Sequence, residues 1–185
     1  MKKKKYIVTG GYGFIGSHIV DKLSSLDYDV IVIDNQIDNE KKIINPRAKY
    51  YQFDLSEISY QNEVIKIIEG AEGVFHCAAL IDVQESLENP HVYEKNNTLS
   101  TMNILNLCVK ANIPRLIFSS SAAVYGNNEN VPLSEKDLCS PISPYGLQKL
   151  YGEKLCKMFS KTYGINTASL RYFNIFGERQ KISGT

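Results

Sequence analysis

Two side chains that can carry out acid/base chemistry, Tyr145 and Lys149, stand four residues apart in the sequence. On a helix this spacing places both on one face, one turn apart. An isolated tyrosine has a pKa of about 10 and is a poor base at neutral pH. A nearby lysine ammonium favours the phenolate and lowers that pKa. The pair is therefore a candidate base for a hydroxyl proton, although the same spacing also arises by chance in helices without chemistry.

A run of three serines, Ser119 to Ser121, ends the strand-like segment that precedes this pair. A hydroxyl at the end of that strand can orient a substrate oxygen beside Tyr145. The alternative is that the serines only form a polar turn between a strand and a loop.

A glycine-rich turn near the N-terminus indicates what the acid/base pair works with. Gly10, Gly13 and Gly16 follow a short apolar strand and open an apolar helix that includes Phe14 and Ile15. In a strand–turn–helix unit, the first glycine permits a tight turn, the second lets backbone approach a pyrophosphate, and the third lets helix and strand pack closely. Free N–H groups at the helix start face the anion. This context predicts dinucleotide binding; the alternative is a glycine-rich turn in another α/β protein.

An acidic residue, Asp34, ends the second β-branched strand and is followed by Asn35. A carboxylate at this position bonds the adenosine ribose hydroxyls and repels a 2′-phosphate, which predicts NAD rather than NADP. The alternative is an Asp-Asn pair that only starts a turn. With a nicotinamide cofactor, Tyr145, Lys149 and the serines predict acid/base chemistry coupled to hydride transfer.

Two further strand ends carry candidate cofactor contacts. Asp54 and Leu55 end the third strand, where an adenine could lie, and the small residues Cys77, Ala78 and Ala79 end the fourth, where a cofactor could pass close to backbone. Ligands bind beyond the carboxyl ends of the strands in such sheets. We therefore expect all these residues at one edge of the sheet.

Strand-like and helix-like segments alternate along the chain. They predict an α/β fold, a Rossmann-type doubly wound parallel sheet with helices on both faces. Ser143 and Pro144 mark a helix start, and Gly164 marks its end. The expected strands are 6–8, 28–33, 49–53, 74–76, 115–119 and 166–170, the expected helices are 14–26, 60–69, 91–110 and 144–163, and loops are expected at 35–47 and 127–141. Residues 1–177 are expected to form the NAD-binding domain, and 178–185 the start of a substrate segment.

Composition excludes several classes of function. The 185 residues are 43% hydrophobic and carry a net charge of +1, which supports a full core and argues against nucleic-acid or membrane-surface partners. No apolar run reaches the roughly 18 residues of a membrane span, and no secretory segment is seen. Four cysteines without a C-x-x-C pair indicate reduced thiols and a cytoplasmic protein, and three histidines give no metal constellation.

The helical segments 91–110 and 143–163 each carry apolar residues on more than one face. One stripe can pack on the sheet while the other meets a partner. In the first helix Ile104 and Leu107 lie off the stripe of Leu99, Met102 and Leu105, and in the second Leu147, Tyr151 and Met158 accompany Leu150, Leu155 and Phe159. This pattern predicts a two-fold homodimer through four helices; the alternative is that both helices are buried more deeply.

The motifs together resemble the extended short-chain dehydrogenase/reductase superfamily, and within it the NAD-dependent nucleotide-sugar epimerases and dehydratases. The matching segments, in the family's order, are 9–18, 34–35, 54–55, 76–79 with Val83 and Ser86, 96–98, 119–126, 144–149 and 171–177. They span nearly the whole chain. Each motif alone is unspecific, whereas the combination is very specific.

The resemblance implies a role for each matching residue. Tyr145 would be the catalytic base, Lys149 would bind the nicotinamide ribose, and Ser121 would bond the reacting sugar oxygen. Asn174 would reach the substrate's phosphates, so Ser121, Tyr145 and Asn174 are the candidate substrate contacts. The implied and inferred cofactor contacts are Gly10, Gly13, Phe14, Ile15, Gly16, Asp34, Asn35, Asp54, Leu55, Cys77, Ala78, Ala79, Asn97, Ser119, Tyr145, Lys149 and Phe173.

The serine segment favours one branch of that family. Dehydratases carry Thr-Asp-Glu where this chain has Ser121, Ala122 and Ala123, so the acid and base of dehydration are missing. The resemblance thus implies a UDP-hexose or UDP-N-acetylhexosamine 4-epimerase. Another nucleotide-sugar enzyme, such as a decarboxylase or reductase, and an NAD-binding fragment without a working sugar site are the alternatives, because family members carry a further C-terminal part that grips the nucleotide sugar.

Overall fold

The structure, a computed structural model, describes residues 3–35 and 43–180. Within these ranges six strands form one parallel sheet in the order β3-β2-β1-β4-β5-β6. They are β1 (Lys5–Thr9), β2 (Asp29–Asp34), β3 (Ala48–Gln52), β4 (Gly73–His76), β5 (Arg115–Ser121) and β6 (Asn166–Tyr172). The strand order reverses between β1 and β4, which is where ligands bind in open sheets of this kind. The predicted Rossmann-type fold is confirmed.

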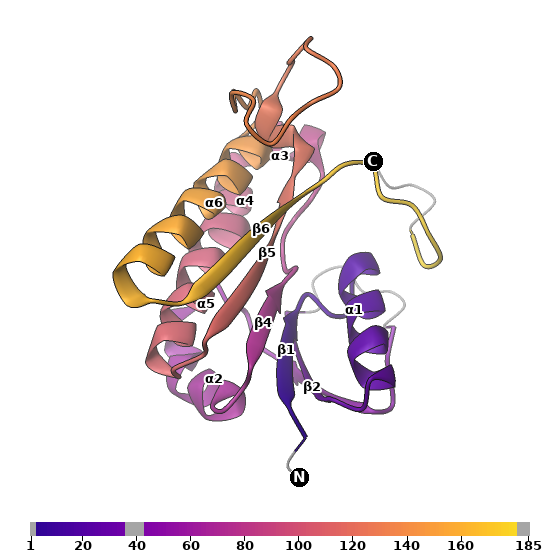
Figure 1. The fold of residues 1–185 in the computed structure, drawn as a ribbon, viewed down its shortest axis with the longest axis vertical. Coiled ribbons are helices and arrows are strands. Elements are labelled where there is room, and N and C mark those ends of the chain that lie inside the picture. The colour runs from indigo at the N-terminus through magenta and orange to yellow at the C-terminus, as the bar shows by residue number, and fades with distance from the viewer. Residues whose placement is uncertain (1–2, 36–42, 181–185) are drawn as a thin grey trace.

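Helices cover both faces of the sheet (Figure 1). One face packs on α1 (Phe14–Ser25), and the other on α2 (Gln61–Ile68), α5 (Ser100–Lys110) and α6 (Pro144–Tyr163). Successive residues of a strand point to opposite faces, so Ile7 and Val8 of β1 enter different cores and both have no exposed surface. These two cores hold the carboxyl ends of the strands at one edge.

The helix that carries Tyr145 and Lys149 begins and ends as predicted. The Ser143 hydroxyl accepts a hydrogen bond from the Gly146 N–H at 3.1 Å, and Pro144 occupies the first helical position. Gly164 ends α6 with a φ of 75°, a left-handed conformation that favours glycine.

The helical region before α5 is more divided than the sequence predicts. A short helix α3 (Val83–Glu88), which the sequence analysis missed, is capped by Asp82, whose side chain accepts from the Glu85 N–H at 2.9 Å. The expected helix 91–110 consists of α4 (Pro90–Tyr93), a π-helical segment η2 (Glu94–Leu99) and α5. Single-turn π segments are rare and often lie at functional sites.

Strands β5 and β6 each extend two residues beyond their predicted ends. The reason is their mutual pairing, which continues through Ser120 with Arg171 and Ser121 with Tyr172. The serine run is therefore part of the sheet, and its last hydroxyl stands at the sheet's carboxyl edge.

The prediction that both long helices expose a second apolar stripe is confirmed for α6 but not for α5. Ile104 and Leu107 of α5 are buried in the core with Leu105, whereas Leu99, assigned to the same stripe as Leu105, is 46% exposed. On α6 the second stripe is open as predicted: Leu147, Tyr151 and Met158 are exposed, and Leu155 and Phe159 are buried.

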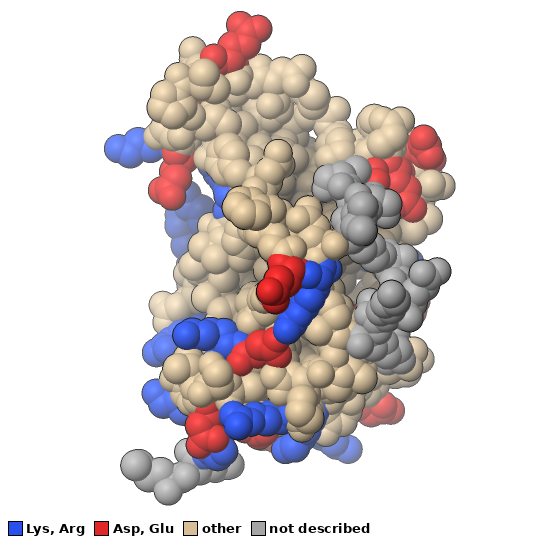
Figure 2. Space-filling view, turned by 90° about the vertical axis from the view of Figure 1, so that its right-hand side faces the viewer, with Lys and Arg blue, Asp and Glu red and all other residues tan. Residues whose placement is uncertain are grey.

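Charged residues of both signs are interspersed on the face seen in Figure 2, with no broad patch of one sign. No helix in the described ranges is long and apolar enough to cross a membrane. Of the predicted loop 35–47, residues 36–42 lie outside the described residues, as do 181–185 of the expected second segment.

Candidate functional site

The glycine turn between β1 and α1 lies against the end of β4. Gly10 has a φ of +68°, and a Cβ there would lie 2.7 Å from the backbone nitrogen of Ala78. The Gly10 carbonyl accepts from the Gly13 N–H at 3.1 Å, which closes the turn. Among the described residues no side chain caps the start of α1. The turn therefore lets a ligand approach the backbone closely. It also presents the N–H groups of the first residues of α1, Phe14 and Ile15, which suits a pyrophosphate.

Asp34 is fixed beside this turn. One of its carboxylate oxygens accepts the Tyr12 N–H at 3.1 Å, and the Gly10 N–H bonds the Ile33 carbonyl at 3.0 Å. The Tyr12 ring stacks on Tyr50, with centroids 4.9 Å apart. Asp34, which is distant from the glycines in sequence, thus contacts the turn directly. This places a carboxylate where the ribose of a bound dinucleotide is expected.

A hollow of about 520 Å³ lies beyond β2 and β3. Asn35 and Asp54, two of the predicted contacts, line it with Phe53 and Tyr60. Leu55, a third predicted contact, does not: its side chain is buried in the core, because it follows the strand on the side that faces α5. The side chain of Leu55 is therefore a core residue.

Tyr145, Ser121 and Lys149 come together at the carboxyl edge of β5. The Ser121 hydroxyl lies close enough to the Tyr145 phenol to favour its ionised form, and it accepts the Ala123 N–H at 3.1 Å. The Lys149 Nζ donates to the Ser119 carbonyl at 2.9 Å and lies 5.7 Å from the Tyr145 ring centroid. The three candidate catalytic side chains, which come from a strand end and one helix, thus share one small site.

Burial changes the proton affinities in this site. It lowers the pKa of Lys149 to about 8, because desolvation penalises the ammonium. It also raises the pKa of Tyr145, and the nearby Ser121 hydroxyl opposes that rise. The direction is opposite to the sequence expectation, in which Lys149 lowers the pKa of Tyr145, because the ammonium is aimed at the Ser119 carbonyl while the phenol is largely desolvated.

Cys77 and Ser119 meet beneath the same site. The Ser119 hydroxyl donates to the Cys77 Sγ at 3.3 Å, and burial raises the pKa of that thiol. Ala78 lies against Gly10, and the next residue, Ala79, is half-buried. The small residues at the end of β4 therefore lie between the glycine turn and the Tyr145 site, as the strand order requires.

The resemblance implies that Asn97 lines the cofactor site, but in the structure its side-chain amide is directed at other protein groups. It is buried, and its amide accepts from the Leu80 N–H at 2.8 Å and donates to the Leu80 carbonyl and to Gln148 Oε1, both at 3.0 Å. The π-helical segment turns this side chain inward, where protein groups use its hydrogen bonds. Sequence reasoning missed Gln148, although it is the neighbour of Lys149.

Phe173 and Asn174 lie past the end of β6 and are exposed, Phe173 by 60%. The segment that they begin continues toward α1 (Figure 1), where Arg179 forms an ion pair with Asp21 at 2.6 Å. His18 of α1 also lies 2.9 Å from the Glu178 carbonyl. The structure thus places both residues past the carboxyl end of β6.

Sequence reasoning also missed a partly buried ion pair behind the site. Glu153, on α6 with Tyr145, accepts two hydrogen bonds from Arg171 at 2.9 and 2.8 Å and one from the Ser120 hydroxyl at 2.6 Å. The one feature of the sequence that could have pointed to Glu153 is its position about two helical turns after Tyr145, on the same helix. Bidentate pairs of this kind fix geometry, so Glu153 ties the ends of β5 and β6 to the catalytic helix.

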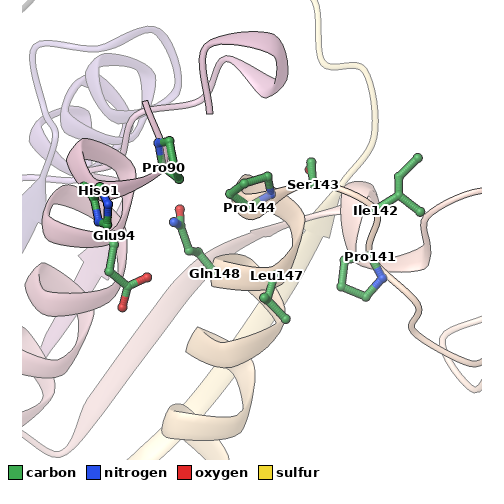
Figure 3. Close-up of a pocket in the computed structure, with 9 residues that line it drawn as sticks. All are labelled: Pro90, His91, Glu94, Pro141, Ile142, Ser143, Pro144, Leu147 and Gln148. Atoms are coloured by element: carbon green, nitrogen blue, oxygen red, sulfur yellow. The ribbon is translucent and has the colours of Figure 1, made fainter. Parts of the chain in front are cut away.

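A second hollow, of about 510 Å³, lies between the α4–η2 segment and the start of α6 (Figure 3). Pro90, His91 and Glu94 line one side, and Leu147 and Gln148 the other. It contains none of the predicted site residues. Among the described residues no group of His, Cys, Asp and Glu could hold a metal ion, so no metal site is proposed.

Comparisons with known proteins agree with this geometry. A UDP-glucose 4-epimerase of Lacticaseibacillus casei is 39% identical over 170 residues, which are 92% of this chain and 51% of that protein. The structure of a UDP-N-acetylglucosamine 4-epimerase from Methanobrevibacter ruminantium M1, in complex with UDP-N-acetylmuramic acid, matches with a TM-score of 0.90 at 40% identity, over 100% of this chain and 59% of that one. A Thermus thermophilus UDP-glucose 4-epimerase in complex with NAD matches with a TM-score of 0.89 at 31% identity, over 97% and 58%.

The chain thus spans between half and three-fifths of the length of these relatives. A profile of the NAD dependent epimerase/dehydratase family matches residues 6–185, nearly the whole sequence. The glycine turn, Asp34 and the Tyr145–Lys149 helix all lie inside that match. The chain belongs to the NAD dependent epimerase/dehydratase family.

Proposed function

We propose that residues 1–177 are the NAD-binding unit of a nucleotide-sugar 4-epimerase and that 178–185 begin the part that holds the sugar nucleotide. The observation that carries the proposal is the grouping of Tyr145 with the Ser121 hydroxyl and the buried Lys149 ammonium, whose Nζ lies 5.7 Å from the Tyr145 ring centroid. The residues also fit the cofactor, because the glycine turn leaves room that a Cβ would fill and Asp34 stands beside it. A UDP-hexose or UDP-N-acetylhexosamine is the proposed substrate, as in the names of the relatives.

In this proposal each side chain handles one part of a C4 oxidation. Bound NAD⁺ supplies a reversible hydride acceptor. The Tyr145 phenolate takes the proton of the C4 hydroxyl, and Ser121 donates a hydrogen bond to the same oxygen. Lys149 holds the cofactor's ribose, and its positive charge beside the Tyr145 ring favours the phenolate against the desolvation that raises the pKa of the phenol. After the 4-keto sugar rotates in the site, its C4 takes back the hydride on the other face and Tyr145 returns the proton to the C4 oxygen, so no net redox change follows.

The alternatives differ in what they require of these residues. A 4,6-dehydratase needs an acid and a base where Ala122 and Ala123 stand, which disfavours it. A decarboxylase or reductase on the same scaffold would keep Tyr145 and Lys149 and differ in the sugar-binding part. A non-catalytic NAD-binding unit would bind the cofactor and turn over no sugar.

Cofactor choice tests the first step of the proposal. Titration calorimetry on this chain should show NAD⁺ binding and weak NADP⁺ binding, because the Asp34 carboxylate repels a 2′-phosphate. Asp34→Ala should weaken NAD⁺ by about 1.5–3 kcal/mol, the value of a hydrogen bond to a charged group. Asp29→Ala, a carboxylate at the other end of β2, is the control and should bind NAD⁺ normally. Equal affinity for both cofactors would contradict the assignment.

We also propose a homodimer, through the exposed face of α6 and the helical segment beside it. Leu147, Tyr151 and Met158 are 60%, 43% and 47% exposed along one face of α6, and Leu99 is exposed on the neighbouring segment. Leu147 also lines the hollow between the two segments (Figure 3). A self-complementary pair of helices is typical of two-fold dimers.

Light scattering at tens of micromolar should report a dimer for this chain, and Leu147→Glu should convert it to a monomer, since a buried unpaired carboxylate is costly. The matched control is Leu138→Glu, a leucine that is 81% exposed on the loop before α6, and it should stay dimeric. A wild-type chain that is monomeric throughout would rule out this interface.

A further inference from the structure

A buried chain of hydrogen bonds runs from the glycine turn to the catalytic helix, and its centre is His76, the last residue of β4. This side chain is 1% exposed and lies between two threonines. Its Nδ1 is 2.7 Å from the Thr9 hydroxyl, and its Nε2 is 3.1 Å from the Thr101 hydroxyl. Thr9 immediately precedes Gly10, and Thr101 stands on α5. Neither threonine nor His76 has a part in the proposed chemistry.

The hydrogen bonds at the Thr101 end determine whether Nε2 of His76 carries a proton. The Thr101 hydroxyl lies 2.7 Å from the Asn97 carbonyl, which can only accept, so its hydrogen points there. The oxygen consequently presents a lone pair to His76, and Nε2 must carry the proton that fills it.

The Thr9 end leads independently to the same arrangement. The Thr9 hydroxyl oxygen accepts the N–H groups of Cys77 and Ala78, each at 3.2 Å, the first shared with the Thr9 carbonyl. With both lone pairs engaged, its hydrogen is left for His76 Nδ1, which must be unprotonated. Burial and the Lys149 ammonium lower the pKa of His76 to about 3, in agreement with a neutral ring.

We propose that His76, as the neutral tautomer with its proton on Nε2, is a positioning residue that sets the glycine turn and the Tyr145–Lys149 helix relative to each other. At one end Thr9 holds the Cys77 and Ala78 backbone against Gly10. At the other, Thr101 anchors the π-helical segment at Asn97.

The link to the catalytic helix passes through Asn97. Its amide holds Leu80, in the segment after β4, and Gln148, which directly precedes Lys149. The His76 ring also stacks on Phe118, with centroids 5.9 Å apart, and the Lys149 Nζ lies 5.2 Å from the same Phe118 ring. His76 therefore contacts both sides of the site from within the core, where it is 1% exposed.

The tautomer is tested directly on this chain by NMR with ¹⁵N-labelled histidine. Long-range ¹H–¹⁵N correlations should show His76 protonated on Nε2 alone at neutral pH, and comparison with His76→Gln assigns the signal among the three histidines. A proton on Nδ1, or on both nitrogens, would overturn the proposal. This measurement does not depend on the proposed function.

The positioning role is tested by NAD⁺ titration of three variants, and this readout rests on the proposed function. His76→Leu removes both hydrogen bonds and should weaken NAD⁺ binding by about tenfold, the value of a hydrogen bond or two. His76→Gln keeps one acceptor and one donor and should recover to within about threefold of wild type. Ile68→Val, a buried change on α2, controls for lost stability and should bind normally.

Should His76→Leu fail to fold, Thr9→Val breaks the chain at its other end and should weaken binding equally. Wild-type affinity in His76→Leu, or in Thr9→Val, would overturn the positioning role. A wild-type chain that binds no NAD⁺ would instead overturn the proposed function, and the tautomer spectrum would then decide the inference alone.

Discussion

Replacing Tyr145 by Phe in the longer protein should reduce turnover by about 10²–10⁴-fold, the range for a positioned acid/base group. The ring and its packing remain, and only the phenolic hydroxyl beside Ser121 is lost. NAD⁺ content and the thermal unfolding midpoint should therefore match the wild type. Turnover within about threefold of wild type would remove Tyr145 from the mechanism.

Lys149→Ala tests the second half of the same pair and should change two quantities. NAD⁺ binding should weaken, because Lys149 is proposed to hold the ribose. The activity profile should also move to higher pH: without the ammonium the phenolate is less favoured, and a higher pH is needed to form it. The matched control is Lys154→Ala, an exposed lysine on the same helix, which should leave the profile in place.

Gly10→Ala should have the largest effect on cofactor binding. The φ of +68° is strained for any residue with a Cβ, at a cost of about 1–3 kcal/mol. The new Cβ would also lie 2.7 Å from the Ala78 nitrogen, so the end of β4 must move. We expect unfolding free energy to fall and NAD⁺ affinity to drop at least about tenfold, since the pyrophosphate is bound by backbone there.

Gly164→Ala separates the two causes. Its φ of +75° carries the same strain, but among the described residues no atom beyond its immediate chain neighbours lies within 4 Å of the added Cβ, and it is at the far end of α6. Chemical denaturation should show a loss of stability in both variants, whereas calorimetry should show lost NAD⁺ affinity in Gly10→Ala only. Normal NAD⁺ binding by Gly10→Ala would contradict the role given to the turn.

Local spacing explains why much of the fold and several site positions could be predicted. The glycine turn, Asp34 and the Tyr145–Lys149 pair depend on a single strand–helix unit, a strand end or one helical turn, and the structure places each at the predicted edge. Ser143, Pro144 and Gly164 mark the ends of α6 by short-range chemistry. Such signals need no knowledge of distant neighbours.

Other features depend on contacts that no local pattern records. Asn97 turns inward because a π-helical segment and Gln148 of another helix surround it. Ile104 and Leu107 lie in the core, whereas Leu99 is exposed. The reason is that the π-helical segment 94–99 changes which side chains of the helix face the sheet. The pKa of Tyr145 rises because tertiary packing desolvates the phenol, an effect that its spacing from Lys149 cannot reveal.

The most direct test of the proposed 4-epimerase uses a UDP-sugar labelled with deuterium at C4 and the longer protein. We predict that NMR will show inversion at C4 with the deuterium retained at C4 of the product, because the hydride is returned to the same sugar carbon and no free cofactor is consumed. Inversion with loss of the deuterium to solvent or to added NAD⁺, or no inversion of any UDP-hexose or UDP-N-acetylhexosamine, would contradict the account.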